Sequence, residues 1–487
     1  MLKIFFTTDI HGFFFPTDYL DNDEKDMGLF KMAGDFQKDG DTLIIDGGDA
    51  LQGSAFTRYC QKELGKFDIV ADIMNKCQYD FVTLGNHDFN YGMDSLRRFL
   101  GKLDAICVCQ NISDDNGDIL FPYVIRKMSS GLIVGVVGIT TDYVQFWEKS
   151  ENLAGIKFIN QFEAARQALS EIKNQVDITI CVYHGGFEKD LETGRLLSKI
   201  QENIACRICR ELEFDILLTG HQHSVQAGRF YEGTYIIQPP HNGKGYAYFE
   251  IEKDSSGLKI KSELRGAGNV IDQGMFGEFA DTEDRIQQWL NESVGTLPEA
   301  LPVDDRVKMA LNGSPLAGFF NNIQLYYSGA QLSAINFAND LSGLPKDVRR
   351  RDLFASYPHP NTFVLLEITG AQLRSVVERS AEYLDYDENG QLVIAESFLR
   401  PKIAHYYYDF YAGIDISLDY RLPKGGRVIS LTCMGKPVQE DDVFTICVDN
   451  YRATGAGGYN AYSDCKVLKL INTEMVDLIV DYFNTTK

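Results

Sequence analysis

The sequence predicts an α/β protein built from two domains. Its 487 residues exceed the length of one typical domain, so two hydrophobic cores are expected. Up to about residue 265, short apolar runs rich in β-branched residues alternate with amphipathic helical patterns, which is typical of an α/β layer. Hydrophobic residues make up 44% of the chain and charged residues 24%, an ordinary balance for a globular protein that is not embedded in lipid.

The elements of the first domain follow in chain order. Strands are expected at residues 2–6, 43–45, 80–84, 133–137, 178–182 and 216–218, and amphipathic helices at 67–76 and 162–175. Glycines at 266 and 268 mark a break, and acidic residues from Asp281 to Asp284 then precede Ile286 and Trp289, as in a helix with a negatively charged first turn. We therefore expect a first domain at 1–272, a linker helix at 273–296 and a second domain at 297–487.

The net charge of −22 limits the partners of the chain. Nucleic-acid polymers and anionic membranes both require a basic surface, so neither is expected to bind. No apolar run reaches the roughly 18 to 20 residues that cross a bilayer. A small anionic substrate would need a local positive site, such as bound metal. No motif indicates a protein partner.

The cysteines and the N-terminus bear on the compartment. Ten cysteines are unevenly spaced, and the close pairs Cys107/Cys109 and Cys206/Cys209 have no second pair that would complete a zinc site. Buried thiols in a reducing compartment are the simplest interpretation. The strand-like run at 2–6 leads directly to Asp9 without a cleavage site. We expect a cytoplasmic protein if Met1 is the native start; the alternative is an exported protein whose signal has been removed.

Five apolar runs end in residues that bind divalent metals. The motifs are Asp9-Ile-His11, Asp46-Gly-Gly-Asp49, Gly85-Asn86-His87-Asp88, His184-Gly-Gly and Gly220-His221-Gln-His223. The carboxyl ends of strands line the ligand crevice of an open α/β sheet, so these side chains can converge from distant parts of the chain. Each motif alone is weak evidence. Together they contain five of the eight histidines, which random placement would rarely produce.

The residue types suit two divalent ions that share a carboxylate. Asp49 is the candidate bridge, with Asp9, His11 and His223 completing one metal shell. Asn86, His184 and His221 would complete the other shell. Imidazole and carboxylate ligands suit manganese, zinc, cobalt or iron, and the choice among these metals is open. His241, which follows two prolines, could line the site or be structural.

At these residues the sequence resembles the calcineurin-like metallophosphoesterases. Further stretches, Asn111-Ile112, Phe121-Pro-Tyr123, Val136 to Thr140 and the C-terminal half, resemble the bacterial 5′-nucleotidase superfamily. The resemblance implies a four-layer α/β/β/α metal domain followed by a smaller mixed α/β domain that holds the nucleoside. It also implies that metal-held hydroxide attacks phosphorus, and that His87 is catalytic rather than a metal ligand.

Two departures from that family favour one branch. Asn90 stands where 5′-nucleotidases usually have an aspartate that orients the catalytic histidine, and residues 332–338 lack their Asn-Gly-Gly-x-Ile-Arg element. Both departures, with the stretches 357–362 and 450–459, resemble the 2′,3′-cyclic-nucleotide 2′-phosphodiesterase/3′-nucleotidase branch. We expect 2′,3′-cyclic and 3′-nucleotides as substrates. The alternatives are a 5′-nucleotidase or nucleotide-sugar hydrolase and, from another class, a nucleotide-binding module without turnover.

Aromatic residues of the C-terminal half are candidates for nucleoside binding. Tyr406, Tyr408 and Tyr459 match family positions that sandwich the base, and stacking tolerates any base because every base has a π-face. The alternative is that some of these tyrosines belong to the core of a strand. Arg452 could pair with phosphate or ribose, or could form a structural ion pair.

Overall fold

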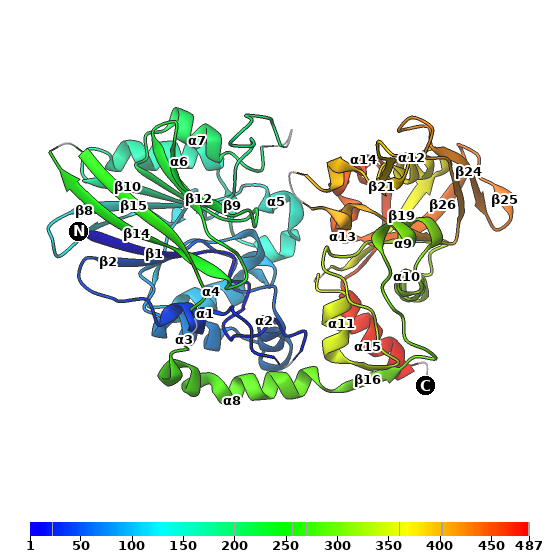
Figure 1. Ribbon diagram of the computed structural model, residues 1–487, viewed down its shortest axis with the longest axis horizontal. Helices are drawn as coiled ribbons and strands as arrows, with labels where there is room; N and C mark the ends of the chain where they lie inside the picture. The colour runs from blue at the N-terminus through cyan, green and yellow to red at the C-terminus, as the bar shows by residue number, and fades with distance from the viewer. Residues whose placement is uncertain are drawn as a thin grey trace. The chain divides into compact units, whose positions relative to one another are not determined.

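The computed structural model describes residues 1–21, 23–197, 201–255, 257–268, 271–359, 361–400 and 403–485. It divides into two compact units, Met1–Gln288 and Trp289–Lys487. Both units combine sheets with helices (Figure 1), and the expected two-domain α/β class is confirmed.

The first unit contains two six-stranded sheets. One has the order β15 (Gly257–Gly266), β14 (Gly245–Asp254), β1 (Leu2–Thr7), β2 (Thr42–Asp46), β3 (Phe81–Val82) and β4 (Ile106–Cys107). The other has the order β12 (Gln226–Tyr231), β13 (Thr234–Gln238), β11 (Ile216–Thr219), β10 (Ile178–His184), β8 (Ile133–Thr140) and β7 (Val124–Lys127). A small sheet joins β6 (Ile119–Phe121), β5 (Cys109–Ser113) and β9 (Lys157–Phe158).

The helices of the first unit lie on the outer faces of the two large sheets and beside the ends of their strands. They are α1 (Leu29–Ala33), α2 (Ala55–Tyr59), α3 (Asp68–Lys76), α4 (Gly92–Lys102), α5 (Val144–Trp147), α6 (Gln161–Ile172) and α7 (Ala205–Glu211), with the shorter η1 (Cys60–Leu64), η2 (Asn86–Phe89) and η3 (Ser150–Leu153). In Figure 1, α1, α3 and α4 lie on one side of the paired sheets and α6 and α7 on the other.

Alternation along the strands explains the layers. Ile4 and Phe6 of β1 and Val136 of β8 pack in one core that contains residues from both sheets. The next residue of β8, Val137, points to the opposite face and packs with Phe162 of α6. Successive side chains of a strand point to opposite faces of the sheet, so each of the two sheets buries both of its faces. With α1, α3 and α4 on the other side of the paired sheets (Figure 1), these two cores give the expected four-layer α/β/β/α order.

Parallel pairing brings the metal-binding motifs to one edge of each sheet. In the first sheet β1 pairs with β2, and β2 with β3, all parallel. In the second sheet β10 pairs in parallel with both β8 and β11. The predicted strand at 80–84 is shorter than expected, because the backbone leaves the sheet after Val82 and turns into η2.

The second unit is built on one five-stranded sheet, in the order β22 (Phe410–Ala412), β17 (Leu332–Ile335), β26 (Val443–Asp449), β19 (Phe363–Thr369) and β27 (Lys466–Ile471). The smaller sheets are β16 (Ser293–Thr296) with β18 (Asp347–Arg349), β20 (Leu384–Tyr386) with β21 (Leu392–Ile394), and β23 (Asp415–Leu418), β24 (Val428–Cys433) and β25 (Lys436–Pro437). Its helices are α9 (Arg306–Asn312), α10 (Pro315–Ser328), α11 (Arg350–Ser356), α12 (Gly370–Ala381), α13 (Asn450–Ala453), α14 (Asn460–Ser463) and α15 (Met475–Thr485), with η4 (Glu396–Phe398), η5 (His405–Tyr407) and η6 (Ala456–Gly458).

The segment expected as a linker helix contains two elements. Helix α8 spans Gln273–Leu290, and its Phe276 and Phe279 pack on Phe15 and Phe30 of the first unit. Residues Ser293–Thr296 form strand β16 of the second unit instead of continuing the helix. Among the described residues, no helix is both long and apolar enough to cross a membrane.

Candidate functional site

The predicted metal ligands lie directly after the strands of the first unit. Asp9 and His11 follow β1, Asp49 follows β2, and Asn86 begins η2 after β3. His184 is the last residue of β10, and His221 and His223 follow β11. The structure therefore brings all seven candidate ligands to the carboxyl ends of parallel strands, as expected for a ligand site in an open α/β sheet.

Five of these ligands have a strained backbone. Of ten non-glycine residues with positive φ in the described chain, half are candidate ligands: Asp9, His11, Asp49, His221 and His223, with φ between 52° and 68°. A left-handed backbone is unfavourable for residues with a side chain, and such residues cluster at functional sites. The surrounding hydrogen bonds must hold them there.

Backbone hydrogen bonds join the ends of β1 and β2. The amide of Asp9 donates to the carbonyl of Gly48 (2.9 Å), and the amide of His11 donates to the carbonyl of Asp49 (2.8 Å). Gly85 allows the third loop to approach, because a Cβ at that position would lie 2.1 Å from Asp49 Oδ1. The glycine preserves the space in which the Asp49 carboxylate sits.

One group of ligand atoms comes from Asp9, His11 and His223. His223 Nε2 lies 3.4 Å from Asp9 Oδ1 and 3.0 Å from His11 Nε2. Two imidazole nitrogens and a carboxylate oxygen thus face a common point, and the three could hold one cation. His241 packs flat against His223, with ring centroids 4.2 Å apart. Of the two roles open for His241, the structure supports lining the site.

A second group comes from Asp9, Asp49 and His184. His184 Nε2 lies 3.2 Å from Asp49 Oδ2 and 3.9 Å from Asp9 Oδ1. The three side chains are almost completely buried, at 0–1% exposure. Within the described residues, these two carboxylates are the polar groups that His184 Nε2 faces. A buried imidazole nitrogen that faces two carboxylates and no other polar partner is the arrangement expected of a metal ligand.

His221 and Asn86 form a third contact at the same edge. His221 Nδ1 lies 2.8 Å from Asn86 Oδ1, so these two candidate ligands of the second ion converge. The other ring nitrogen, Nε2, lies 2.7 Å from Glu202 Oε1, and the indole of Trp147 stacks on the ring. A carboxylate that accepts the second ring N–H fixes the tautomer of a ligating histidine. No motif pointed to Glu202 or Trp147.

Backbone carbonyls orient the rings of His11 and His184. His11 Nδ1 lies 2.6 Å from the carbonyl of Gln52, and His184 Nδ1 lies 2.7 Å from the carbonyl of Gly47. A carbonyl can only accept, so Nδ1 carries the proton in both rings and Nε2 is free for a metal. Both rings therefore present Nε2 to the carboxylates.

Asp88 has a structural role next to the ligands. Its buried carboxylate accepts hydrogen bonds from the backbone amides of Asp49, Ala50, Leu51 and Gly85. Burial, with the neighbouring charge of Asp49, raises the pKa of Asp88 to about 6. Asp88 thus ties the loop after β2 to the loop after β3, and so sets the relative positions of Asp49 and Asn86.

Charge at the site favours cations. Burial raises the pKa of Asp9, but bonding to His223 and the charge of His184 outweigh it, so the pKa of Asp9 lies well below its usual range. For Asp49 the neighbouring histidines likewise outweigh burial and hold its pKa low. Burial lowers the pKa of His184, but the charges of Asp49 and Asp9 raise it to about 10. Two buried carboxylates therefore stay ionised, which requires compensating positive charge.

The donor set fits two divalent ions. Carboxylate oxygens of Asp9 and Asp49, four imidazoles and the Asn86 amide oxygen converge without a competing lysine or arginine among their described hydrogen-bond and ion-pair partners. Imidazole with carboxylate suits manganese, iron, cobalt or zinc. The assignment of each ligand to one ion stays a prediction.

His87 lies beside this centre. Its backbone amide donates to Asp49 Oδ1 (2.7 Å), and its ring lies edge-on to His11, with centroids 5.5 Å apart. Its Nδ1 lies 2.8 Å from Asn90 Oδ1, so Asn90 contacts the predicted catalytic histidine although it is not an aspartate. The Asn90 amide nitrogen in turn donates to Glu148, which no motif indicated.

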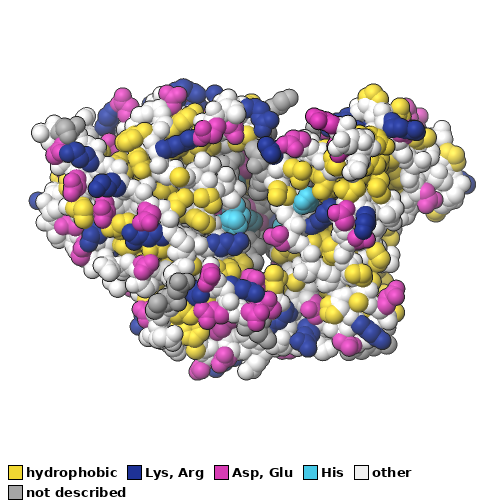
Figure 2. Space-filling model, in the orientation of Figure 1, with side chains coloured by type: hydrophobic (Ala, Val, Ile, Leu, Met, Phe, Trp, Pro, Cys, Tyr) yellow, Lys and Arg dark blue, Asp and Glu magenta, His cyan; other side chains and the backbone are white. Residues whose placement is uncertain are grey.

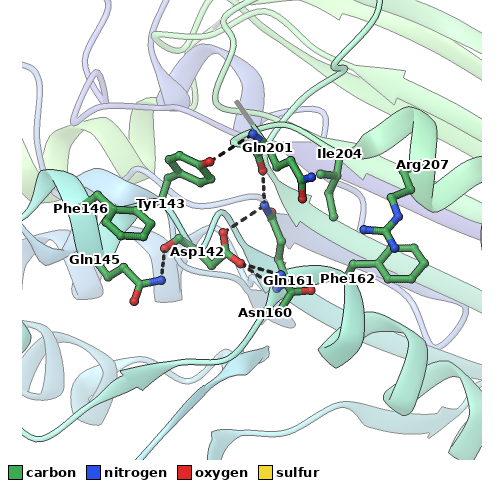
Figure 3. Close-up of a pocket in the computed structure, with 10 residues that line it drawn as sticks. All are labelled: Asp142, Tyr143, Gln145, Phe146, Asn160, Gln161, Phe162, Gln201, Ile204 and Arg207. Atoms are coloured by element: carbon green, nitrogen blue, oxygen red, sulfur yellow. Dashed lines mark hydrogen bonds between the residues drawn. The ribbon is translucent and has the colours of Figure 1, made fainter. Parts of the chain in front are cut away.

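A pocket whose lining includes Gln201, the residue before Glu202, contains a set of hydrogen-bonded polar residues (Figure 3). Gln161 Nε2 donates to the backbone oxygen of Gln201 (2.9 Å) and to the Asp142 carboxylate (3.3 Å). The same nitrogen lies 3.3 Å from the backbone oxygen of Glu202. Gln161 therefore holds the loop that presents Glu202 to His221.

In the second unit, Arg452 and Tyr459 have structural contacts. Arg452 and Asp409 form an ion pair at 2.8 Å, and each side chain is 1% exposed. Arg452 also donates to the backbone oxygens of Tyr406 (2.7 Å) and Ala456 (2.8 Å). Tyr459 is also 1% exposed, and its hydroxyl donates to the Tyr407 oxygen. Arg452 thus takes the structural role left open in the sequence, and Tyr459 the core role.

Tyr406 and Tyr408 are partly buried. The ring of Tyr408 packs 4.7 Å from the ring of Tyr383, and its hydroxyl donates to the Ala310 oxygen (3.1 Å). Tyr406 lies edge-on to Tyr407, with centroids 4.6 Å apart. Base stacking by these tyrosines stays a prediction. Pro360, in the 357–362 stretch, lies outside the described residues.

Two family models match the chain. Residues 2–225 match the calcineurin-like phosphoesterase model, and residues 293–464 match the 5′-nucleotidase C-terminal domain. A crystal structure from Staphylococcus aureus, described as a candidate 5′-nucleotidase, is 32% identical with a TM-score of 0.92, over 99% of this chain and 96% of that one.

Two curated relatives have lower identity. The trifunctional nucleotide phosphoesterase YfkN of Bacillus subtilis is 25% identical over 99% of this chain, which spans 38% of that protein's length. The 2′,3′-cyclic-nucleotide 2′-phosphodiesterase/3′-nucleotidase of Salmonella typhimurium is 24% identical over 93% of this chain and 81% of its own. Both names describe phosphoric ester hydrolases.

Metal binding should release a proton from His184. With a pKa of about 10, this ring is protonated at neutral pH in the metal-free protein, and an incoming ion must displace that proton. Apparent metal affinity should therefore rise about tenfold for each unit of pH between 6 and 8. Titration with a competing fluorescent chelator at several pH values measures this slope. An affinity that does not change with pH would contradict the assignment of His184 as a ligand.

Replacing Arg452 with methionine should destabilise the second unit. The change leaves Asp409 buried without its partner, which typically costs about 3–5 kcal/mol. Chemical denaturation measures the free energy of unfolding, with Arg421→Met, at an exposed ion pair, as the matched control. Equal stability of the two variants would show that Arg452 does not hold the segments around 406 and 456 together.

Proposed function

The chain belongs to the calcineurin-like phosphoesterases that carry a 5′-nucleotidase C-terminal domain, and on this premise we propose that it hydrolyses phosphate esters of nucleotides. The observation that carries the proposal is the convergence of Asp9, Asp49 and His184, all nearly inaccessible to solvent, at the ends of three strands. Buried carboxylates that stay ionised require nearby cations to compensate their charge.

Two divalent ions bound here would supply Lewis acidity to the phosphate oxygens and to the attacking water. Asp49, 3.8 Å from His11 and 3.2 Å from His184 through the same carboxylate oxygen, is the residue best placed to serve both ions. Its other oxygen accepts from the His87 amide. Asp49 thus links the metal ligands to the segment that carries the catalytic histidine.

The residues beside the ligands supply the remaining chemistry. With Nδ1 bonded to Asn90, His87 has only Nε2 with which to meet the phosphoester. From that nitrogen the ring would stabilise charge in the transition state or protonate the leaving oxygen, as a general acid does. The nucleoside would be held by the second domain, where Tyr406 and Tyr408 are the partly exposed aromatic candidates.

We favour 2′,3′-cyclic nucleotides and 3′-nucleotides as substrates. Support comes from Asn90, which replaces the expected aspartate, and from the name of the Salmonella typhimurium relative. The second candidate is 5′-nucleotide hydrolysis, supported by the higher identity to the Staphylococcus aureus chain. A binding module without turnover is disfavoured, because a silent homologue has no need to keep every metal ligand.

We infer that small nucleotides rather than polymers are the substrates. The net charge is −22, and on the face drawn in Figure 2 lysine and arginine side chains are interspersed with aspartate and glutamate. A polynucleotide needs a continuous basic surface to replace its counterions. A mononucleotide needs only a local cationic site.

Substrate choice tests this proposal directly. We expect kcat/KM for 2′,3′-cyclic AMP and 3′-AMP to exceed that for 5′-AMP by about tenfold or more, because selectivity must come from differential binding in the transition state. Initial rates with the manganese-loaded protein measure the three values. A preference for 5′-AMP would contradict the preference for 2′,3′-cyclic and 3′-nucleotides, but it would not contradict the phosphoesterase assignment. Absence of hydrolysis with every metal and nucleotide would overturn both.

A further inference from the structure

We propose that Glu148 is a positioning residue of the phosphoesterase reaction, which fixes the Asn90 amide so that His87 carries its proton on Nδ1. The inference rests on the proposed function for its kinetic consequence. Its structural content, the proton position on one ring, does not depend on activity. Glu148 lies 61 residues after His87 in the sequence and belongs to none of the metal-binding motifs.

The donors and acceptors of this chain of contacts allow one arrangement. An ionised carboxylate can only accept, so the Asn90 atom that faces Glu148 must be the amide nitrogen, Nδ2. The amide oxygen then faces His87 Nδ1 at 2.8 Å. That oxygen can only accept, so Nδ1 must hold a hydrogen. Glu148 thus determines the His87 tautomer through Asn90.

Glu148 is itself held by donors. Its second oxygen, Oε1, accepts from the backbone amide of Lys149 and from Asn152 Nδ2, both at 2.8 Å. Asn152 also donates to the backbone oxygen of Asn90 (2.9 Å). Three donor groups therefore converge on the Glu148 carboxylate from three residues. A neutral amide at position 148 could not accept from all three.

Without a carboxylate at this point, the amide could turn. Asn90 would then present Nδ2 to His87 and disfavour a hydrogen on Nδ1. His87 must keep a hydrogen on Nδ1 while it donates from Nε2. With Asn90 turned, this state of the ring would lose the hydrogen bond from Nδ1 to Asn90 Oδ1 that stabilises it. Glu148 thus orients His87 indirectly, through Asn90, whereas an aspartate at position 90 would orient the ring by direct contact.

Two nearly isosteric exchanges test this arrangement. Glu148→Gln places an amide among three donors, and Asn90→Asp places a second carboxylate against Glu148. Each single variant should lower kcat roughly tenfold and change KM little, as expected for a group that acts on general acid catalysis. The double variant N90D/E148Q restores complementarity, because the amide introduced at position 148 can donate to the new carboxylate and still accept from Lys149 and Asn152.

The double variant should therefore recover kcat to within about threefold of wild type, a strong departure from additivity. Glu151→Gln, at an exposed carboxylate three residues further along the chain, is the matched control and should behave as wild type. Metal content, measured by elemental analysis, should be equal in all five proteins. The proposal is overturned if E148Q keeps full kcat, if the losses of the two exchanges multiply in the double variant, or if E148Q loses metal.

The tautomer gives a readout that is independent of turnover. In zinc-loaded protein labelled with ¹⁵N-histidine, the His87 signals should show hydrogen on Nδ1 in wild type and in the double variant, and a shift towards Nε2 in E148Q. The variant His87→Ala identifies the signals. An unchanged tautomer in E148Q overturns the positioning role even if hydrolysis is confirmed. The expected shift in a protein without hydrolytic activity would uphold the positioning and overturn the proposed function.

Discussion

The site of the first unit depends on one electrostatic constraint: two carboxylates are kept ionised in a place that water scarcely reaches. Asp9 and Asp49 are each 1% exposed, and their pKa values are held low by the histidines around them. Burial of such charges is expensive unless cations or protons compensate. In the metal-free protein, protonated His184 supplies part of that compensation, and a metal bound by Nε2 would displace its proton.

The fold places these carboxylates by means of backbone conformations that are unfavourable by themselves. Asp9, His11 and Asp49 have positive φ, and paired strands, the Gly48 carbonyl and the Asp88 carboxylate hold their loops in place. The two sheets share one apolar core, so the strand ends that carry the ligands are fixed relative to one another. Groups behind the ligands then set the tautomers, with carbonyls at His11 and His184 and carboxylates acting on His221 and His87.

The sequence was sufficient for the parts of the site that local patterns encode. Each motif combines a strand end, a glycine and a metal-binding residue type within a few residues, so the α/β class and the convergence of the seven candidate ligands at the strand ends could be predicted. Metal binding by these residues stays a prediction. The roles of Glu148 and Glu202 could not be predicted, because neither belongs to a motif. Their partners, Asn90 and His221, lie 58 and 19 residues away in the chain. Tyr459 matched a base-binding position of the family and Arg452 was open to two roles, but the burial of both side chains depends on packing that a single sequence does not encode. The length of β3 was overestimated, because the apolar run continues into the turn that presents Asn86.

The most direct test of the account is the position of the metals. Anomalous diffraction at the manganese edge, from crystals grown with manganese, should show two peaks about 3.5–4 Å apart, the separation typical of dinuclear phosphoesterase sites. Both peaks should lie within coordination distance of Asp49, one beside His11 and His223 and the other beside Asn86, His184 and His221. A single peak, or two peaks that do not share Asp49, would contradict the dinuclear centre on which the proposed function depends.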